Sequence, residues 1–377
     1  MDDTNCSLIE HFCAVVDPRI DRKKLHALTG ILIIAVCAVI GGANNFDEIE
    51  VFANAHLAWF KKFLDLPNGI PSHDTFERVF ARINPHEFRK CFAKWTKGLS
   101  GIFTDVIALD GQTYRGARGK GQKKSPIHVV SAWAVGLRLV LAQTKVDEKS
   151  NEITAIPKVL KLLDVKGCII TIDAMGCQQK IAQQIIDQGG DYILGLKGNQ
   201  GSTLAAIEEH FSMIPESSCE RYSDVDKGHG RIETRNHLAV NSSSILDLKD
   251  WPGLKSAVKI VSTREINGVS TTEARFYLCS MESKLIENIG CAIRSHWGIE
   301  NSLHYVLDVT FKQDASRVRI GNGPENFGIL RQIAINALRG APNAKNSSPS
   351  INLKRRRAAM DNDYLGLVMQ AAGLDKS

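Results

Sequence analysis

The sequence predicts an α/β fold, in which a mixed sheet carries helices on its faces. Two short apolar runs, residues 106–110 and 168–173, each end in an aspartate, and runs of this length are typical of buried central strands. Two further β-prone runs, 127–135 and 137–146, are separated by Gly136 and predict an antiparallel pair. Segments with helical spacing lie between the later strands, which is the pattern of an α/β protein.

The first 97 residues predict a helical N-terminal domain. The apolar segment 28–40 is too short for a membrane span, which needs roughly 20 residues, so a buried helix is expected. A turn at 67–69 precedes an amphipathic helix for which Asp74 and Glu77 form a candidate capping box. The turn and helix resemble half of a helix-turn-helix, and this helix either contacts DNA or packs inside the domain.

Residues 98–340 predict the main domain. After the antiparallel pair come a helix at 153–163, the strand that ends at Asp173, a helix at 178–186 and a strand at 191–196. The resulting order β-β-β-α-β-α-β is that of a ribonuclease-H-like core. A strand-rich insertion is expected at about 200–282, followed by a helical stretch at 286–311 and a helix at 325–338. Residues 341–377 predict a polar, basic C-terminal tail.

Composition narrows the class of protein. The 377 residues include 47 basic and 41 acidic side chains, a formal net charge of +6, which is compatible with nucleic acid as a partner. Basic side chains cluster at 115–124 and 354–357, where they either contact phosphate or cover solvated loops and a solubilising tail. The nine cysteines are scattered, which argues against a zinc ribbon or a disulfide framework and favours a reducing cytoplasm. The acidic start of the chain argues against a signal peptide.

Three acids are the candidate catalytic residues. Asp110 and Asp173 are placed where open α/β sheets form their sites, and Glu300 lies far downstream on a helix. Together they predict a pocket for divalent metal, because Mg²⁺ takes oxygen ligands; the alternative for each aspartate is to cap the loop or helix that follows. Asp308 and Asp314 are alternatives for the third ligand.

Two histidines accompany the third acid. His296, Glu300 and His304 recur at a spacing of four, which places them on one helix face. They could form a zinc set, but the spacing of a zinc protease helix is absent. The favoured interpretation is that Glu300 binds metal while the histidines contact DNA phosphate or the neighbouring acid; a core or surface role is the alternative.

Several long motifs resemble one known family. They lie at 108–116, 151–157, 171–178, 191–200 and 296–309, and in this order they are similar to the H-repeat-associated proteins, which are DDE transposases of bacterial insertion sequences. The resemblance implies a ribonuclease-H-like catalytic domain that uses two Mg²⁺ (or Mn²⁺) ions to cleave and transfer strands at element ends. It places Asp110, Asp173 and Glu300 at the DDE positions and implies a homodimer on DNA. The chain has Gln112 where the family usually has lysine, which predicts a weaker phosphate contact there.

The sequence therefore predicts a DNA transposase of the cytoplasm, associated with the nucleoid and not with a membrane. Its expected partner is double-stranded DNA, both element ends and target. Candidates for contact with DNA are basic side chains in loops beside the proposed site and the two histidines, namely Arg115, Arg118, Lys197, Arg231, His296 and His304. The alternatives are a metal-dependent DNA nuclease and an inactive, transposase-derived DNA-binding protein.

Overall fold

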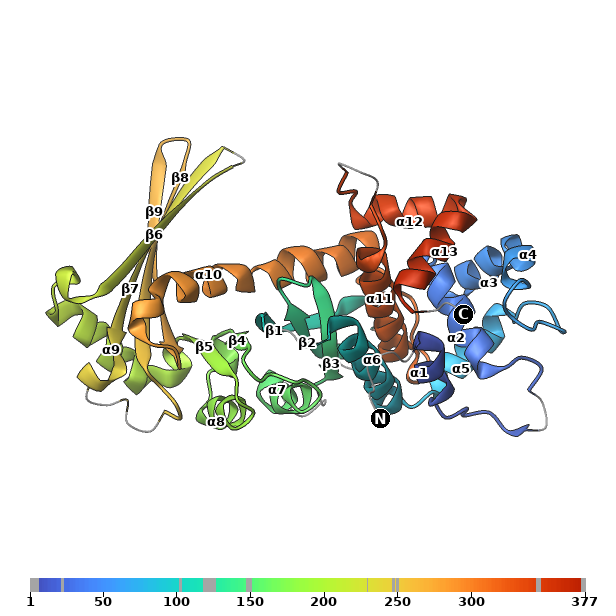
Figure 1. The fold of residues 1–377 in the computed structure, drawn as a ribbon, viewed down its shortest axis with the longest axis horizontal. Coiled ribbons are helices and arrows are strands. Elements are labelled where there is room, and N and C mark those ends of the chain that lie inside the picture. Colours follow the sequence, from blue (N-terminus) through green and yellow to red (C-terminus); the bar gives the residue numbers. More distant parts are fainter. Residues whose placement is uncertain are drawn as a thin grey trace.

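A nine-stranded mixed sheet runs through the molecule in the order β3-β2-β1-β4-β5-β9-β8-β7-β6 (Figure 1). The computed structural model describes residues 7–21, 24–101, 104–117, 127–146, 151–228, 230–245, 248, 251–343 and 347–373. Strands β1, β4 and β5 are parallel, and the other neighbouring pairs are antiparallel. The first five strands are β1 (Val106–Tyr114), β2 (Ile127–Ala134), β3 (Leu139–Lys145), β4 (Ile169–Ile172) and β5 (Asp191–Leu196).

Helices cover both faces of this part of the sheet, as predicted. Alternate side chains of β1 point to opposite faces, because successive residues of a strand alternate. Ile107 and Leu109 join the core beneath α7 (Glu152–Leu160) and α8 (Gln179–Asp187). Ala108 instead belongs to the core that contains Ile299 and Leu303 of the long helical stretch. In chain order the elements are β1, β2, β3, α7, β4, α8 and β5. This confirms the predicted order β-β-β-α-β-α-β.

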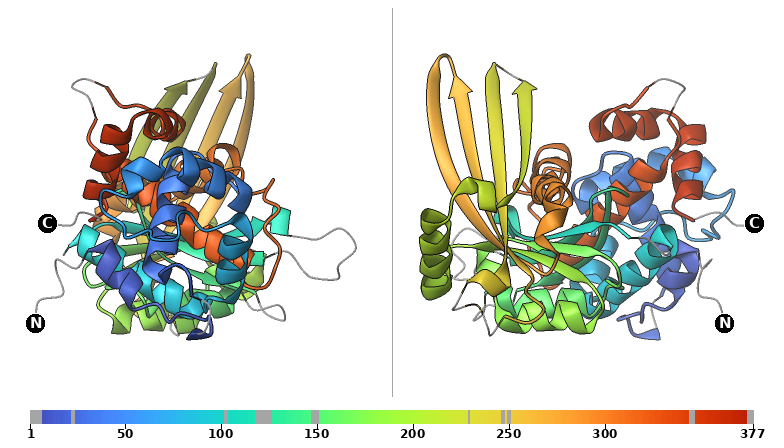
Figure 2. Two further views of the ribbon diagram at one scale, coloured as in Figure 1. Left: turned by 90° about the vertical axis from the view of Figure 1, so that its right-hand side faces the viewer. Right: turned by 60° about the vertical axis from the view of Figure 1, so that its left-hand side comes forward.

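The predicted strand-rich region continues the same sheet. After α9 (Gly201–Met213), β9 pairs antiparallel with β5, and three further strands follow outward from it. These strands project beyond the rest of the molecule as an arm (Figure 2). The arm consists of β6 (Glu220–Gly228), β7 (Arg231–Asn241), β8 (Ser256–Ile266) and β9 (Val269–Cys279).

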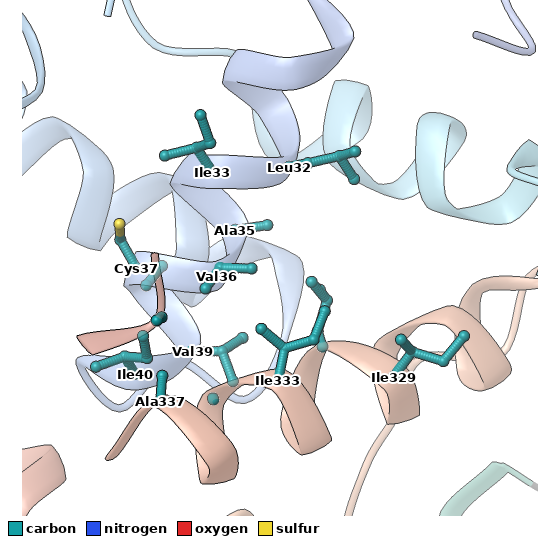
Figure 3. Close-up of a cluster of buried hydrophobic side chains, with 14 of the residues drawn as sticks. Leu32, Ile33, Ala35, Val36, Cys37, Val39, Ile40, Ile329, Ile333 and Ala337 are labelled. Carbon is teal, nitrogen blue, oxygen red and sulfur yellow. The ribbon is translucent and has the colours of Figure 1, made fainter. Parts of the chain in front are cut away.

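A long helical stretch joins the arm to a helical body (Figure 1). It begins as α10 (Ile286–His296) and contains two π-helical segments, Glu300–His304 and Val306–Thr310. The body packs around α2 (Leu28–Ile40) and α11 (Gly323–Gly340), whose aliphatic side chains meet in Figure 3. Around them lie α1 (Leu8–Cys13), α3 (Phe46–Ala55), α4 (Leu57–Phe60), α5 (His73–Arg82) and α6 (Pro85–Ser100).

The apolar segment is a buried helix, as predicted, since 11 of the 13 residues of α2 are buried. Among the described residues, no helix combines the length and apolar character needed to cross a membrane. The helix after the 67–69 turn also exists as α5, but Ser72, and not Asp74, is its N-cap residue. Phe76, Val79 and Phe80 of α5 are buried, which shows one packed face; DNA contact by the other face stays a prediction.

The predicted polar tail is wrong, because the segment forms α12 (Ile351–Met360) and α13 (Asn362–Ala371). Both helices contribute to the core of the body. Lys354 and Arg355 of the basic cluster are buried. The Lys354 ammonium donates to the carbonyls of Leu338 and Ala341 at the end of α11, so the charge serves a helix terminus instead of solvent or phosphate. The predicted domain boundaries near 97 and 340 stay predictions.

Candidate active site

Asp110 and Asp173 occupy equivalent positions on neighbouring parallel strands. The pairing of β1 with β4 ends at Leu109 opposite Ile172, and an aspartate follows each of these residues. β1 itself continues to Tyr114 alongside β2, so Asp110 lies within its strand and not at the predicted end. Both aspartates nevertheless lie at the same level of the sheet, where the parallel part of β1 stops.

Glu300 and His304 join Asp110 from the long helical stretch. The Nδ1 atom of His304 lies 3.6 Å from Asp110 Oδ2 and 3.4 Å from Glu300 Oε2. One potential ligand atom of each of the three residues lies within 4.8 Å of the others. The side chain of His304 is 6% exposed and that of Asp110 is 16% exposed, whereas Glu300 is half-exposed. The downstream acid therefore meets the first aspartate, with a buried imidazole beside both.

The helix that carries Glu300 and His304 is not a regular α-helix. Its first π-helical segment, Glu300–His304, carries both site residues, and π-helical turns are frequent at functional sites. Two arginines from other helices satisfy carbonyls of this stretch. Arg339 of α11 donates to the Ser302 carbonyl, and Arg355 of α12 donates to the Thr310 carbonyl. The body thus holds the irregular helix in place.

Asp173 lies in the same cavity but outside the three-residue group. Its Oδ1 atom accepts hydrogen bonds from the backbone N–H groups of Met175 (3.1 Å) and Gly176 (3.4 Å), so it also caps the turn after β4. A Cβ atom on Gly195 would lie 3.2 Å from the backbone nitrogen of Ala174. Glycine at this position of β5 therefore lets the Asp173 turn pack closely against the next strand.

Within the acidic centre, formed by Asp110, Glu300 and His304, burial disfavours the charge of Asp110. Burial raises the pKa of Asp110 to about 7; His304 opposes this shift, and the charges of Glu300 and Asp173 add to it. The adjacent His304 lowers the pKa of Glu300. A nearby positive charge stabilises the ionised form of a carboxylate whose charge is disfavoured by burial, so a bound cation would favour ionisation of Asp110.

Sequence reasoning missed a fourth acid, Glu152, at the start of α7. A Cβ atom on Gly111 would lie 1.9 Å from Glu152 Oε1, so glycine beside Asp110 leaves room for this carboxylate. Burial, followed by the charge of Asp173, raises the pKa of Glu152. Glu152 lies in one of the family-like motifs, but a helix N-terminus offered no separate signal of proximity to the two strand aspartates.

A cavity of about 610 Å³ opens beside the acids. Asp110, Asp173 and Glu300 line one part of it, and the remainder is largely apolar. A smaller cavity of about 260 Å³ lies over the arm and shares Arg275 and Trp297 with the first. The Arg275 guanidinium lies 5.3 Å from the centre of the Trp297 ring. The two cavities are thus adjacent, and together they extend from the acidic centre onto the arm.

The predicted DNA-contact residues have different surroundings. Lys197 is exposed and lines the larger cavity, and Arg231 lines the smaller one. Arg115 is 80% exposed and lies 3.9 Å from Asp314, while Arg118 lies outside the described residues. His296 lines the larger cavity, with its Nδ1 atom 2.9 Å from the Thr171 hydroxyl.

Two other acids were alternatives for the third ligand, and both lie outside the group that contains Glu300. The amide of Gln112 donates to Asp308 Oδ2 at 3.1 Å, and Asp314 lies beside Arg115. His304 faces two carboxylates from a buried position, as expected for contact with a neighbouring acid; its contact with DNA phosphate stays a prediction. Gln112 likewise points to Asp308 and Gln313 inside the protein.

Known proteins are similar in sequence to this chain over nearly its whole length. The family model described as "Transposase DDE domain" matches residues 101–337, and the model described as "DDE_Tnp_1-associated" matches residues 9–96. The "H repeat-associated putative transposase YhhI" of Escherichia coli K12 is 42% identical over 97% of this chain and 98% of its own. The "Putative transposase YncI" of Escherichia coli O157:H7 is 40% identical over 96% of this chain and 94% of its own.

One solved structure, a piggyBac transposase synaptic complex with hairpin DNA, aligns with a TM-score of 0.44 and 10% identity. The alignment covers 93% of this chain and 75% of the other. The family assignment rests on the sequence matches, which span nearly the full length of both partners. The chain belongs to the H-repeat-associated family of DDE transposases.

Proposed function

We propose that the chain is an active DNA transposase, which cleaves phosphodiester bonds at element ends and joins the 3′ ends to a target. The observation that supports this most is the meeting of Asp110 and Glu300, 190 positions apart in the numbering, at one level of the sheet, with Asp173 in the same cavity. The order β3-β2-β1-β4-β5 supports assignment of β1–β5, α7 and α8 to a ribonuclease-H-like core.

The donor atoms fit a divalent cation. Asp110 and Glu300 offer carboxylate oxygens a few ångströms apart, and Asp173 offers a further carboxylate in the same cavity. Carboxylates and water are the ligands that Mg²⁺ and Mn²⁺ favour. When bound, two such ions would activate the attacking hydroxyl and stabilise the leaving oxygen. The three acids would hold the ions and keep the reacting phosphate in position.

Basic side chains near the cavities would position the DNA. Lys197 and Arg231 line the two cavities, and we propose that they contact the sugar–phosphate backbone together with Arg115, Arg118 and His296. Such contacts fix the register of DNA on a protein without reading its sequence. A homodimer that pairs two element ends, working at the nucleoid in the cytoplasm, completes the proposal.

A strand-transfer assay tests the function. Duplexes made from the DNA on both sides of the gene are supplied intact and with pre-cleaved 3′ ends, together with plasmid target and Mg²⁺ or Mn²⁺. The wild type is expected to cleave and join, whereas Asp110→Asn and Asp173→Asn are expected to lose at least about a thousandfold of both activities because the ions lose a ligand. Asp164→Asn, which removes an exposed acid beside Lys97, is the matched control.

Two other outcomes identify the alternative functions. Cleavage by the wild type without joining of pre-cleaved ends would indicate a nuclease. DNA binding without cleavage or joining, equal in wild type and Asp110→Asn, would indicate an inactive DNA-binding relative.

A further inference from the structure

The imidazole of His304 has a position that the three acids alone do not explain. It is buried and its Nδ1 atom faces Asp110 and Glu300 at 3.6 and 3.4 Å. Both separations exceed an ordinary hydrogen bond, which is about 2.7–3.2 Å for a nitrogen donor. Two ligands that are each about 2.1 Å from one ion stand roughly 3.0–3.4 Å apart at octahedral or tetrahedral angles. The observed spacing is closer to that of ligands around a cation.

The far side of the same ring gives an independent indication. Among the described residues, neither His304 Nε2 nor Asp308 Oδ1 has a hydrogen-bond partner, although both atoms are buried. Burial raises the pKa of Asp308, and the His304 imidazole is among the groups that oppose this shift. The other oxygen of Asp308 accepts from Gln112 at 3.1 Å. A histidine that binds metal through one nitrogen commonly donates its other N–H to a carboxylate or water, which fixes the ring.

We propose that His304 binds the divalent ion directly through Nδ1, between Asp110 and Glu300, and that this nitrogen ligand makes the site prefer Mn²⁺ to Mg²⁺. The inference rests on the proposed metal-dependent function and adds a ligand to it. Asp308, held by Gln112, acts as a positioning residue that orients the ring through a water bound to Nε2.

The preference follows from the chemistry of the donors. Mg²⁺ binds oxygen ligands and demands near-ideal octahedral geometry at short distances. Imidazole suits first-row transition ions, and Mn²⁺ also accepts carboxylate and water. A set of two carboxylates and one imidazole is therefore better matched to Mn²⁺. It lacks the thiolates of many structural zinc sites, and its third member, Glu300, is half-exposed, which leaves room for water or DNA oxygen on the ion.

The test measures binding of Mn²⁺ alone to the full-length, chelator-treated protein, without DNA. Pulsed electron paramagnetic resonance of bound Mn²⁺ is expected to show coupling to a directly bound ¹⁴N nucleus in the wild type. His304→Asn places an oxygen near the former Nδ1, because the two atoms are equally far along the side chain. This variant is expected to lose the nitrogen coupling and about tenfold to hundredfold in Mn²⁺ affinity, and to lose most of the preference over competing Mg²⁺.

His296→Asn is the matched control, since His296 lines the same cavity but lies outside the three-residue group. Its nitrogen coupling and Mn²⁺ affinity are expected to equal those of the wild type. Asp110→Asn reports whether the ion occupies the proposed centre and is expected to weaken binding.

Each adverse outcome is distinguishable. Mn²⁺ binding that is weakened in Asp110→Asn but shows no nitrogen coupling in the wild type would overturn the role of His304. The transposase proposal would then still be decided by the strand-transfer assay. Nitrogen coupling that persists in His304→Asn and disappears in His296→Asn would show that His296 supplies the bound nitrogen. That result would also overturn the inference. Absence of any Mn²⁺ binding would overturn it together with the metal centre.

Discussion

At the scale of single residues, Asp110 is held where its charge is disfavoured. Burial is the largest cause that raises its pKa from 3.8 to about 7. Between these values the folded protein binds a proton that the unfolded chain has released, so the free energy of unfolding falls as pH rises. Asp110→Asn removes the ionisable group at this position. The free energy of unfolding of the metal-free variant, relative to that of the wild type, should therefore increase from about pH 4 to about pH 7 and stay level above.

Thermal denaturation in the presence of a chelator, repeated across this pH range, measures the effect, and Asp164→Asn serves as the control for loss of an exposed acid. A difference between Asp110→Asn and the wild type that does not change with pH would contradict the assigned burial of this carboxylate.

Glu152 gives a second prediction at this scale. Its carboxylate lies against Gly111 and senses the charge of Asp173, so it is placed to support an ion on the Asp173 side of the centre. Glu152→Gln is expected to raise the metal concentration for half-maximal cleavage by about tenfold, as loss of a supporting group typically does, with partial rescue at high metal. Equal metal dependence in Glu152→Gln and in the exposed control Glu216→Gln would assign Glu152 to packing alone.

At the scale of elements, the strands were predictable and several helix contacts were not. The apolar runs that form β1 and β4 are short and bounded, so their sequence identifies them. Lys354 and Arg355 were expected either to contact phosphate or to be solvated, because local sequence cannot reveal that distant carbonyls need donors. The same limit hid Glu152, since its nearness to Asp173 depends on how α7 packs against the sheet. Residues whose surroundings come from elements distant in the sequence are thus the ones that the sequence left unassigned.

The Arg355 contacts lead to a prediction about the elements that they join. Its guanidinium donates to carbonyls at the end of α2 and at Thr310, and lies 4.1 Å from the Phe311 ring centre. Arg355→Met would remove the side-chain donor of the Thr310 carbonyl, whereas the Val39 carbonyl keeps the N–H of Gly42. Leaving a buried group without a donor costs about 1–3 kcal/mol, so a loss of about 1–3 kcal/mol in the free energy of unfolding is expected. Arg355→Lys should recover little of this, because an ammonium lacks the planar fork.

Urea denaturation measures these changes, with the exposed neighbour Arg356→Met as the matched control. A stability loss of equal size at position 356 would show that the cluster acts through its net charge and not through the buried contacts of Arg355.

At the scale of the whole molecule, strand β1, which carries Asp110, lies between the arm and the helical body, and α10 runs from one toward the other (Figure 1). The smaller cavity extends the site along the side of the arm that faces α10, with Arg231, Arg264 and Arg294 among its lining residues. Arg235 on the same strand is already paired with Asp224 at 2.5 Å. Arg294 is likewise paired with Asp226 at 2.6 Å, so we expect Arg231 and Arg264 to make the DNA contacts on this surface, which continues from the cavity of the three acids.

Arg231→Ala and Arg264→Ala should therefore each weaken DNA binding. If each arginine neutralises one phosphate, each substitution is expected to reduce the slope of log affinity against log salt concentration by about 1. Fluorescence anisotropy with one labelled duplex over a series of salt concentrations gives both quantities. Lys180→Ala is the matched control, because Lys180 is exposed on α8, which covers the opposite face of the sheet from α10. Equal losses in all three variants would place the DNA elsewhere and leave the arm without a role in binding it.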